Sequence, residues 1–505
     1  MVQALAPWRP ELRLRSAFPF LNIVEGALAQ DKDIATARRG PASHSGDHRF
    51  RHFLEAVRRA FVEFLTIPTL VIIGFLGLGA LLYYLDQLRI ERDWPTFLFG
   101  SNESISTLLG TIAASIITVT SITFSLLLIA VQQSAAALTG QVYDQFLRRR
   151  ANQAYFGFFI GLALYCLIIL ATVEPDYTPF YGASVAFLLT VVALYLLILL
   201  IYSTIDQMRP VAIIDNIRDH TLSARKTQRK LLAATRATTG PDQASHVRLR
   251  ASESGFVTAL NVDRLEDLSR DCLGSAEIRL LRCIGDYVSL GEELMEVRGK
   301  AAPDDDVCKK LLSAIRLERR RDLGTDPGFG IEQMANIAWT TVSTSKQNPE
   351  PGKLVCRALR DLAAYWYGDG GGNVERAGAD RLIVCPDRVP SDLIRAFETL
   401  VVVASESMQH HVLAETYQAL ALAAERLPAD RRKELQGVVD RSISALGEHV
   451  LTAELDESIA RLAGAMDRGG YDSSHLREAR DKFAVSWNEL HSRATRSTAW
   501  QPAKG

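Results

Sequence analysis

Cysteine is scarce in this chain, and its spacing excludes the usual cysteine-based architectures. The 505 residues contain six cysteines, and no two of them form a CxxC pair. Zinc sites and disulfide frameworks generally show such regular spacing. We therefore expect reduced cysteines that pack in the interior. The six are Cys166, Cys272, Cys283, Cys308, Cys356 and Cys385.

A charge of one sign and the common catalytic motifs are also missing. The formal net charge is -1, so no basic field indicates nucleic-acid binding. The adjacent His410 and His411 would point about 100° apart on a helix, which does not suit a shared metal. Residues 368–373 (GDGGGN) lack a following Lys–Ser/Thr, which favours a flexible loop over a phosphate cradle. We expect no catalytic site, no metal and no cofactor.

Charged side chains are absent from four long apolar stretches in the first 205 residues. Each stretch has 20 or more residues without Asp, Glu, Lys or Arg. A helix needs about 20 predominantly apolar residues to cross the hydrocarbon core of a bilayer. The sequence therefore predicts a mostly α multi-pass membrane protein. The predicted spans are residues 65–85, 107–131, 154–173 and 181–203.

Basic residues are concentrated on one side of the predicted spans. They precede the first span, form Arg148–Arg150 after the second and follow the fourth, whereas acidic residues prevail in the other two loops. Positively charged loops remain cytoplasmic. We thus expect both termini and residues 203–505 to lie in the cytoplasm. Arg148–Arg150 is also typical of a phosphate or lipid site, although we favour a role in topology.

The composition changes along the chain predict six segments. Residues 1–47 lack a sustained apolar period and a cleavable signal, which indicates disorder or an over-long gene start. Residues 204–235 are predicted to extend the fourth span as a helix. The segments are a disordered 1–50, a transmembrane domain 51–205, a helical connector 206–243, a small β-module 244–300, a helical domain 305–495 and a tail 496–505.

The region after the spans contains short strands followed by helices. Alternating runs separated by glycines predict strands at 247–249, 255–260, 276–282 and 294–297. Residues 285–291 resemble the hairpin of small biotinyl/lipoyl-type domains but lack the modified lysine, so we expect a structural module. Apolar periodicity predicts helices at 307–319, 331–343, 353–366, 391–407, 411–427, 431–446, 451–466 and 474–493.

The second predicted span carries a polar stripe. At about 100° per residue, its members fall within an arc of about 120°. Small and hydroxylated residues serve close helix packing, and they also line pores. The stripe therefore predicts a face toward protein or water rather than lipid. Its residues are Thr111, Ser115, Thr118, Ser121, Ser125 and Gln132.

Glycines give the other spans packing signals of their own. Gly157 and Gly161 form a GxxxG at the start of the third span, and Gly74, Gly77 and Gly79 lie in the first. No acidic or basic residue lies inside a predicted span, which argues against a proton-coupled carrier.

A tight turn is predicted at Asp326, Pro327, Gly328 and Phe329. Proline restricts one backbone angle and glycine permits a positive one. We expect this turn to start a helix at Ile331 and to bury Phe329. A ligand-contacting loop is the alternative interpretation.

Several segments together resemble the DUF2254 family of predicted bacterial membrane proteins. Residues 107–133 followed by 145–163 are similar to its membrane core, and residues 326–337 (DPGFGIEQMANI) to its signature beyond the membrane. Residues 254–260 with 285–294 resemble its β-module. The resemblance implies this architecture and a location in the bacterial inner membrane, but no activity. The chain departs from the family pattern at residues 137–140 and 348–350.

Two functions from different classes are compatible with these observations. The polar stripe and the uncharged spans favour a passive channel or pore, which four-helix subunits would form as a homo-oligomer in the lipid bilayer. The large region after the spans favours a non-transporting scaffold or sensor that binds a ligand or protein. An enzyme ranks third, because no acid–base or nucleophile set is visible.

Overall fold

The computed structural model describes most of the chain between residues 65 and 485. The described ranges are 65–87, 102–137, 149–174, 178–239, 246–299, 302–344, 349–368, 376, 378, 380–446 and 449–485. The predicted disordered segment 1–50 and the tail 496–505 lie outside them. In these ranges the protein consists of helices and two small sheets, as the fold class predicts.

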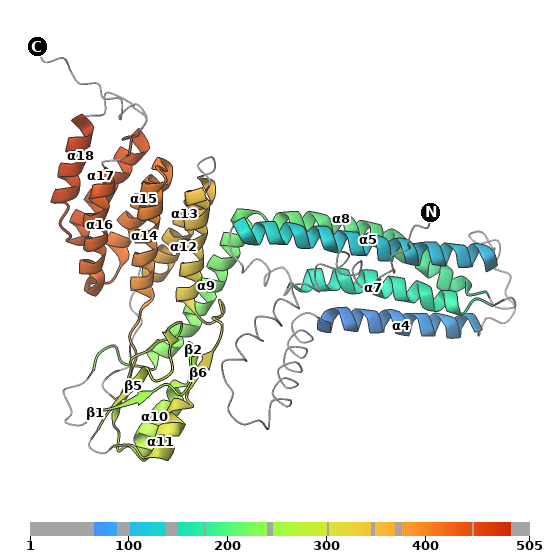
Figure 1. Cartoon of the computed structure of the whole chain (residues 1–505), viewed down its shortest axis with the longest axis horizontal. Helices are drawn as coiled ribbons and strands as arrows, with labels where there is room; N and C mark the ends of the chain where they lie inside the picture. Colours follow the sequence, from blue (N-terminus) through green and yellow to red (C-terminus); the bar gives the residue numbers. More distant parts are fainter. Residues whose placement is uncertain are drawn as a thin grey trace, which may run out of the picture. The chain divides into compact units, whose positions relative to one another are not determined.

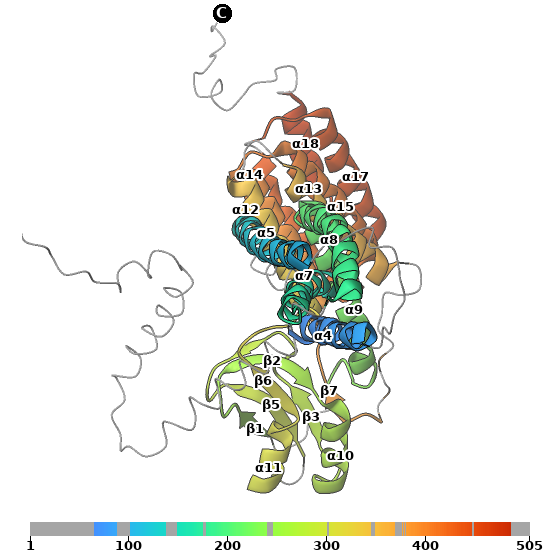
Figure 2. The same ribbon diagram turned by 90° about the vertical axis from the view of Figure 1, so that its right-hand side faces the viewer.

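Within the described ranges, four helices are long and apolar enough to cross a membrane, which confirms the four predicted spans. The helices run beyond several of the predicted ends, because polar residues of the first and last turns continue the backbone hydrogen bonding. They lie side by side in both views (Figures 1 and 2). They are α4 (Thr66–Gln87), α5 (Asn102–Ala137), α7 (Arg150–Ala171) and α8 (Phe180–Gln207).

Helix α7 is the centre of the membrane helices. Half of its most apolar window is buried, against 17–22% in the other three. Its GxxxG pair lets α4 approach closely. A Cβ on Gly157 would lie 2.7 Å from the Pro68 Cα, and one on Gly161 would lie 2.5 Å from the Phe75 ring. The two glycines of this GxxxG therefore pack against α4, which agrees with the predicted packing role.

Polar contacts join three of these helices at the end where α4 finishes. The buried Asp86 carboxylate accepts hydrogen bonds from the backbone N–H groups of Tyr181 (3.2 Å) and Gly182 (3.4 Å) at the start of α8. A negative charge at a helix N-terminus is stabilised by the helix dipole. The Tyr165 hydroxyl of α7 donates to the Gly182 carbonyl at 2.8 Å.

The predicted continuous helix from the fourth span into the connector is wrong. Helix α8 ends at Gln207, and a separate helix, α9 (Pro210–Ala233), follows. Pro210 has no N–H to donate to the preceding turn, and proline disfavours a helical conformation at the residue before it, Arg209. Arg209 accordingly has an extended backbone (φ -65°, ψ 135°).

The strands form two sheets with the orders β1-β5-β3-β7 and β4-β2-β6. All pairs are antiparallel except β3 with β7. Together with helices α10 (Val262–Cys272) and α11 (Asp305–Leu312), we call these sheets the β-module. The strands are β1 (His246–Arg250), β2 (Gly255–Leu260), β3 (Glu277–Leu280), β4 (Tyr287–Val288), β5 (Glu293–Arg298), β6 (Ile315–Glu318) and β7 (Ile383–Val384).

The β-module differs from the prediction in three places. The four predicted strands are present, but α10 lies between them, where no helix was expected. The helix predicted at 307–319 ends at Leu312, and β6 follows because residues 315–318 alternate and pair with β2. Strand β7 was not predicted, since two residues carry no periodic signal.

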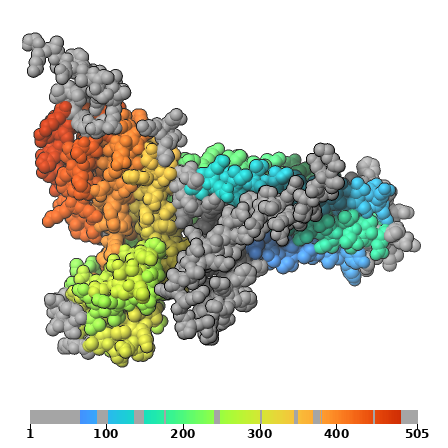
Figure 3. Space-filling model, in the orientation of Figure 1, coloured from blue at the N-terminus to red at the C-terminus, as the bar shows by residue number. Residues whose placement is uncertain are grey.

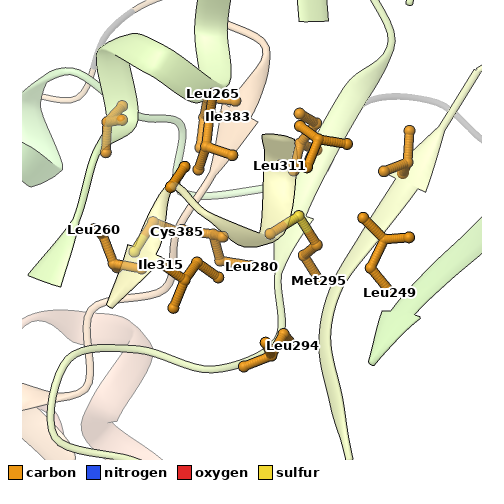
Figure 4. Packing of buried hydrophobic residues seen from close by; sticks show 14 of the residues in the cluster. Leu249, Leu260, Leu265, Leu280, Leu294, Met295, Leu311, Ile315, Ile383 and Cys385 are labelled. Atoms are coloured by element: carbon orange, nitrogen blue, oxygen red, sulfur yellow. The ribbon is translucent and has the colours of Figure 1, made fainter. Parts of the chain in front are cut away.

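The helices and strands of the β-module share one core. Leu265 of α10, Leu311 of α11, Met295 of β5 and Ile383 of β7 are fully buried in it (Figure 4). Helices α10 and α11 lie next to each other beside the strands (Figure 2). The distant β7 is thus part of this core.

Helices account for the rest of the described chain, and each predicted helix from residue 331 onward has a counterpart. The last one is described as far as Val485. In Figure 3 their surface runs in colour from yellow (α12 and α13) to red (α17 and α18). They are α12 (Pro327–Thr344), α13 (Glu350–Tyr367), α14 (Val389–Glu406), α15 (His410–Arg426), η2 (Ala429–Arg431), α16 (Arg432–Leu446), α17 (Ala453–Gly469) and α18 (Ser474–Val485).

The α4–α7 contact gives a test of the membrane packing. We expect Gly157→Ala to lower the melting temperature of the purified protein, because the new methyl group meets the backbone of Pro68. Overpacking of this kind costs about 1–3 kcal/mol. Gly77→Ala is the matched control, since its Cβ would meet nothing within 4 Å. Equal melting temperatures for both variants would contradict the packing role of Gly157.

Candidate functional site

The polar stripe lies on the outer surface of α5. All six side chains (Thr111, Ser115, Thr118, Ser121, Ser125 and Gln132) are exposed in the single chain. The opposite face is buried and includes Leu109, Ile112 and Ile116; α5 packs on α7. Any water-filled path along the stripe must therefore lie between chains rather than within one.

Three hydroxyls of the stripe are satisfied within the helix. Thr111, Thr118 and Ser125 donate to the carbonyl oxygens four residues earlier, at 2.7, 2.8 and 3.0 Å. Such bonds make a hydroxyl tolerable in an apolar environment. Gln132, the last residue of the stripe, lies near the end of the span.

The turn at Asp326 starts a helix four residues earlier than predicted. Helix α12 begins at Pro327, a favoured first residue because the missing N–H has no partner there anyway. One Asp326 oxygen accepts the Phe329 N–H at 3.0 Å, and the other accepts Arg321 Nε at 2.7 Å. Phe329 is half-buried rather than buried, and the Arg321 guanidinium lies over its ring, 4.7 Å from the ring centre.

Glycines let this turn contact three other elements. Gly285, at φ +94° in the β-module, approaches so closely that a Cβ would lie 2.5 Å from Asp326 Oδ2. A Cβ on Gly328 would lie 2.8 Å from Asp392 Oδ2 of α14, and one on Gly330 would lie 1.9 Å from the Thr221 hydroxyl oxygen of α9. The glycines of DPGFGI thus have a structural explanation.

Besides the contact of Thr221 with Gly330, helix α9 makes a second contact with the C-terminal region through Arg225. Its side chain is 3% exposed and forms a bidentate ion pair with Asp387, at 2.8 and 2.6 Å. Its guanidinium also lies 5.8 Å from the centre of the Trp366 ring of α13. Burial alone would raise the pKa of Asp387, but the hydrogen bonds and charge of Arg225 hold it below its usual value.

Further arginines surround the segment that carries Asp387. Arg376 donates to the Thr235 hydroxyl (2.9 Å) and to the Cys385 carbonyl (3.0 Å). Arg388 pairs with Asp286 of the β-module. These contacts could not be predicted from the sequence, because their residues lie outside any recognisable motif.

An open pocket of about 560 Å³ lies between the end of α9 and the β-module. Lys230, Arg316 and Asp263 give its lining mixed charge. Among the described residues, no group of three or more His, Cys, Asp or Glu side chains is arranged to hold a metal.

The two adjacent histidines point apart, as predicted. His410 Nδ1 lies 2.9 Å from His449 Nδ1, whereas His411 Nδ1 lies 2.7 Å from Glu454 Oε2. The glycine-rich loop lies outside the described residues beyond Gly368.

Comparison with known proteins agrees with this architecture. Residues 62–427 match the model of a family described as "Predicted membrane protein (DUF2254)". The chain belongs to the DUF2254 family. The match covers all four membrane helices, the β-module and α12–α15. Both contacts of α9 with the C-terminal region, through Thr221 and through Arg225, therefore lie within the family region.

Relatives of this DUF2254 protein include the uncharacterised proteins Mb1321c of Mycobacterium bovis and Rv1290c of Mycobacterium tuberculosis. Each is 25% identical over 309 residues, which cover 58% of this chain and 59% of the relative. The alignment thus spans less than two thirds of the relatives. No solved structure matches the chain.

Two substitutions separate the roles of Asp326. Asp326→Asn keeps an oxygen that can accept the Phe329 N–H but loses the charge that pairs with Arg321. Asp326→Ala loses both, so we expect a larger fall in melting temperature, by the equivalent of about 1 kcal/mol for the lost cap. Unchanged thermal stability in Asp326→Ala would instead favour the ligand-contacting interpretation.

Asp392 gives the C-terminal region a pH-dependent stability. Burial raises the pKa of its carboxyl to about 6, and the charge of Asp326 adds to the rise. Because the unfolded value is about 3.9, ionisation of Asp392 opposes folding as the pH rises through 4–6. Three guanidinium groups oppose the rise: Arg395, Arg321 and Arg388.

We therefore expect Asp392→Asn to be more stable relative to the wild type at pH 7.5 than at pH 4.5. The gain is about 2 kcal/mol before the loss of the exposed Arg395 pair is subtracted. Melting temperatures of both proteins at the two pH values measure it. A difference that does not change with pH would contradict the raised pKa.

Proposed function

We propose that this DUF2254 protein assembles into an oligomeric passive channel with a cytoplasmic regulatory region. The exposed polar stripe on α5 is the observation that carries the proposal. A single chain leaves these side chains on its surface, where they can meet the same face of another copy. Unpaired polar groups in hydrocarbon cost several kcal/mol, which favours placing the face toward protein or water.

The proposal includes an orientation in the bacterial inner membrane with both termini in the cytoplasm. Arg149 and Arg150 lie at the start of α7, and the basic helix α9 follows α8. Asp86 and Glu174 lie at the other ends of the membrane helices. This charge distribution supports a cytoplasmic location for the positively charged side of the membrane helices.

Helix α9 supplies a physical route for regulation. Two residues separate it from the end of α8, and the buried Arg225–Asp387 pair and the Gly330–Thr221 contact hold it against the C-terminal region. A displacement of these contacts would change the position of α9 and hence act on the last membrane helix.

A scaffold or sensor without transport is the second candidate. The hydroxyls of Thr111, Thr118 and Ser125 are already satisfied within α5, so they do not require water. The open pocket beside α9 also suits a sensor, because it borders the helix that follows the last membrane helix. Flux and solvent access along α5 distinguish the two functions.

We expect Ser115→Leu/Thr118→Leu to abolish conductance in planar bilayers while the protein still inserts and keeps its oligomeric state. The leucines replace polar groups on the proposed path and narrow it. Ile122→Leu, on the exposed side of the same helix, is the matched control and should conduct like the wild type. A non-conducting wild type, or altered assembly with unchanged conductance, would favour the scaffold.

Cysteine substitution measures the access of water to positions along α5 directly. If the path is wet, water-soluble thiol reagents should label cysteines at positions 115, 118 and 125 faster than at 120 and 123. The latter two side chains are partly buried in the packed face. Equal protection of all five positions would argue against a water-filled path.

A further inference from the structure

Two cysteines that are distant in the sequence meet at the edge of the β-module. Cys283 follows β3, and Cys385 follows β7. Their Sγ atoms lie 3.6 and 3.8 Å from the same acceptor, the Pro386 carbonyl oxygen. Both side chains are buried, and both are free thiols. The predicted packing role therefore does not describe them fully, because they also form a pair.

The two thiols differ in acidity. The neighbouring Cys283 thiol lowers the pKa of Cys385, and the charges of Arg376 and Arg388 lower it further against the effect of burial. The interaction with Cys385 and burial raise the pKa of Cys283. A thiolate is the reactive form of cysteine, so the lowered pKa favours Cys385 over Cys283 as the nucleophile of this pair.

Another buried cysteine shows that burial alone does not give this arrangement. Cys356 in α13 is fully buried beside the Thr416 hydroxyl, at 3.3 Å. Burial raises its pKa to about 12. It therefore lacks both the second thiol and the acidity, and it serves as an internal reference.

We propose that Cys283 and Cys385 form a reversible disulfide when the protein meets a hydroperoxide. The Cys385 thiolate attacks one peroxide oxygen, the O–O bond breaks, and the leaving oxygen takes a proton to become water or an alcohol. The resulting sulfenic acid is attacked by the Cys283 sulfur, which loses its proton; the S–S bond forms and the hydroxyl leaves as water. In total two thiols are oxidised and one peroxide is reduced.

The disulfide would link two segments that lie at the contact of α9 with the C-terminal region. Residues 283–286 of the β-module contain Asp286, which pairs with Arg388. Residues 385–388 contain Asp387, which pairs with Arg225. A covalent link between these segments restricts their separation, so the oxidised and reduced proteins differ at the contact between α9 and the start of α14.

The test uses the full chain in detergent micelles, reduced and then treated with hydrogen peroxide. Free thiols are alkylated in denaturant, and peptides are identified by mass spectrometry without reduction. We expect a linked peptide pair containing Cys283 and Cys385 that disappears after reduction, with Cys356 still alkylated. Complete alkylation of Cys283 and Cys385, under peroxide conditions that oxidise the exposed Cys272, would overturn the proposal.

Two variants test whether Cys283 and Cys385 react with each other. In Cys283→Ser we expect peroxide to leave a sulfenic acid on Cys385, which a dimedone probe labels, because the resolving thiol is gone. Cys272→Ser should form the Cys283–Cys385 link like the wild type. Loss of the link in Cys272→Ser would contradict an intramolecular pair of these two cysteines, and the wild-type measurement stands whether or not Cys283→Ser folds.

Discussion

A buried ion pair, Arg225–Asp387, anchors the contact of α9 with the C-terminal region. Two charges removed from water are costly, and their mutual attraction offsets this only when the geometry is good. Here the guanidinium and the carboxylate meet in bidentate geometry beside the Trp366 ring. Loss of one partner from such a pair typically costs about 3–5 kcal/mol, because the other charge is left buried. The pair therefore positions α9, α13 and the start of α14 together.

Glycines permit close approach both between the membrane helices and in the rest of the protein, but the groups that approach them differ. Between the membrane helices, where lipid is as apolar as a leucine side chain, close contact comes from small residues such as Gly157 and Gly161. Beyond the membrane, glycines at 285, 328 and 330 admit the carboxylates and the hydroxyl of neighbouring elements. In both regions a glycine marks the place where another segment of the chain approaches.

Features that repeat locally could be predicted from the sequence. Length and hydropathy gave the four spans, alternation gave β2 and β5, and apolar periodicity gave α12–α17. Contacts between distant segments could not be predicted, because Arg225 and Asp387, or Cys283 and Cys385, have no common motif. The stripe on α5 was visible as a pattern, but periodicity places residues on a face without saying what covers that face. The start of α12 was misplaced because a proline can begin a helix as well as precede one.

Strand β7 makes the β-module discontinuous in the sequence. Ile383 and Val384 pair in parallel with β3, although α12 and α13 lie between β6 and β7 in the chain. During synthesis, residues 246–318 leave the ribosome well before the strand that borders β3 exists. Closing so long a loop carries an entropic cost and tends to slow folding. The β-module therefore reaches its final form only after the two helices that interrupt it have been made, which ties its maturation to theirs.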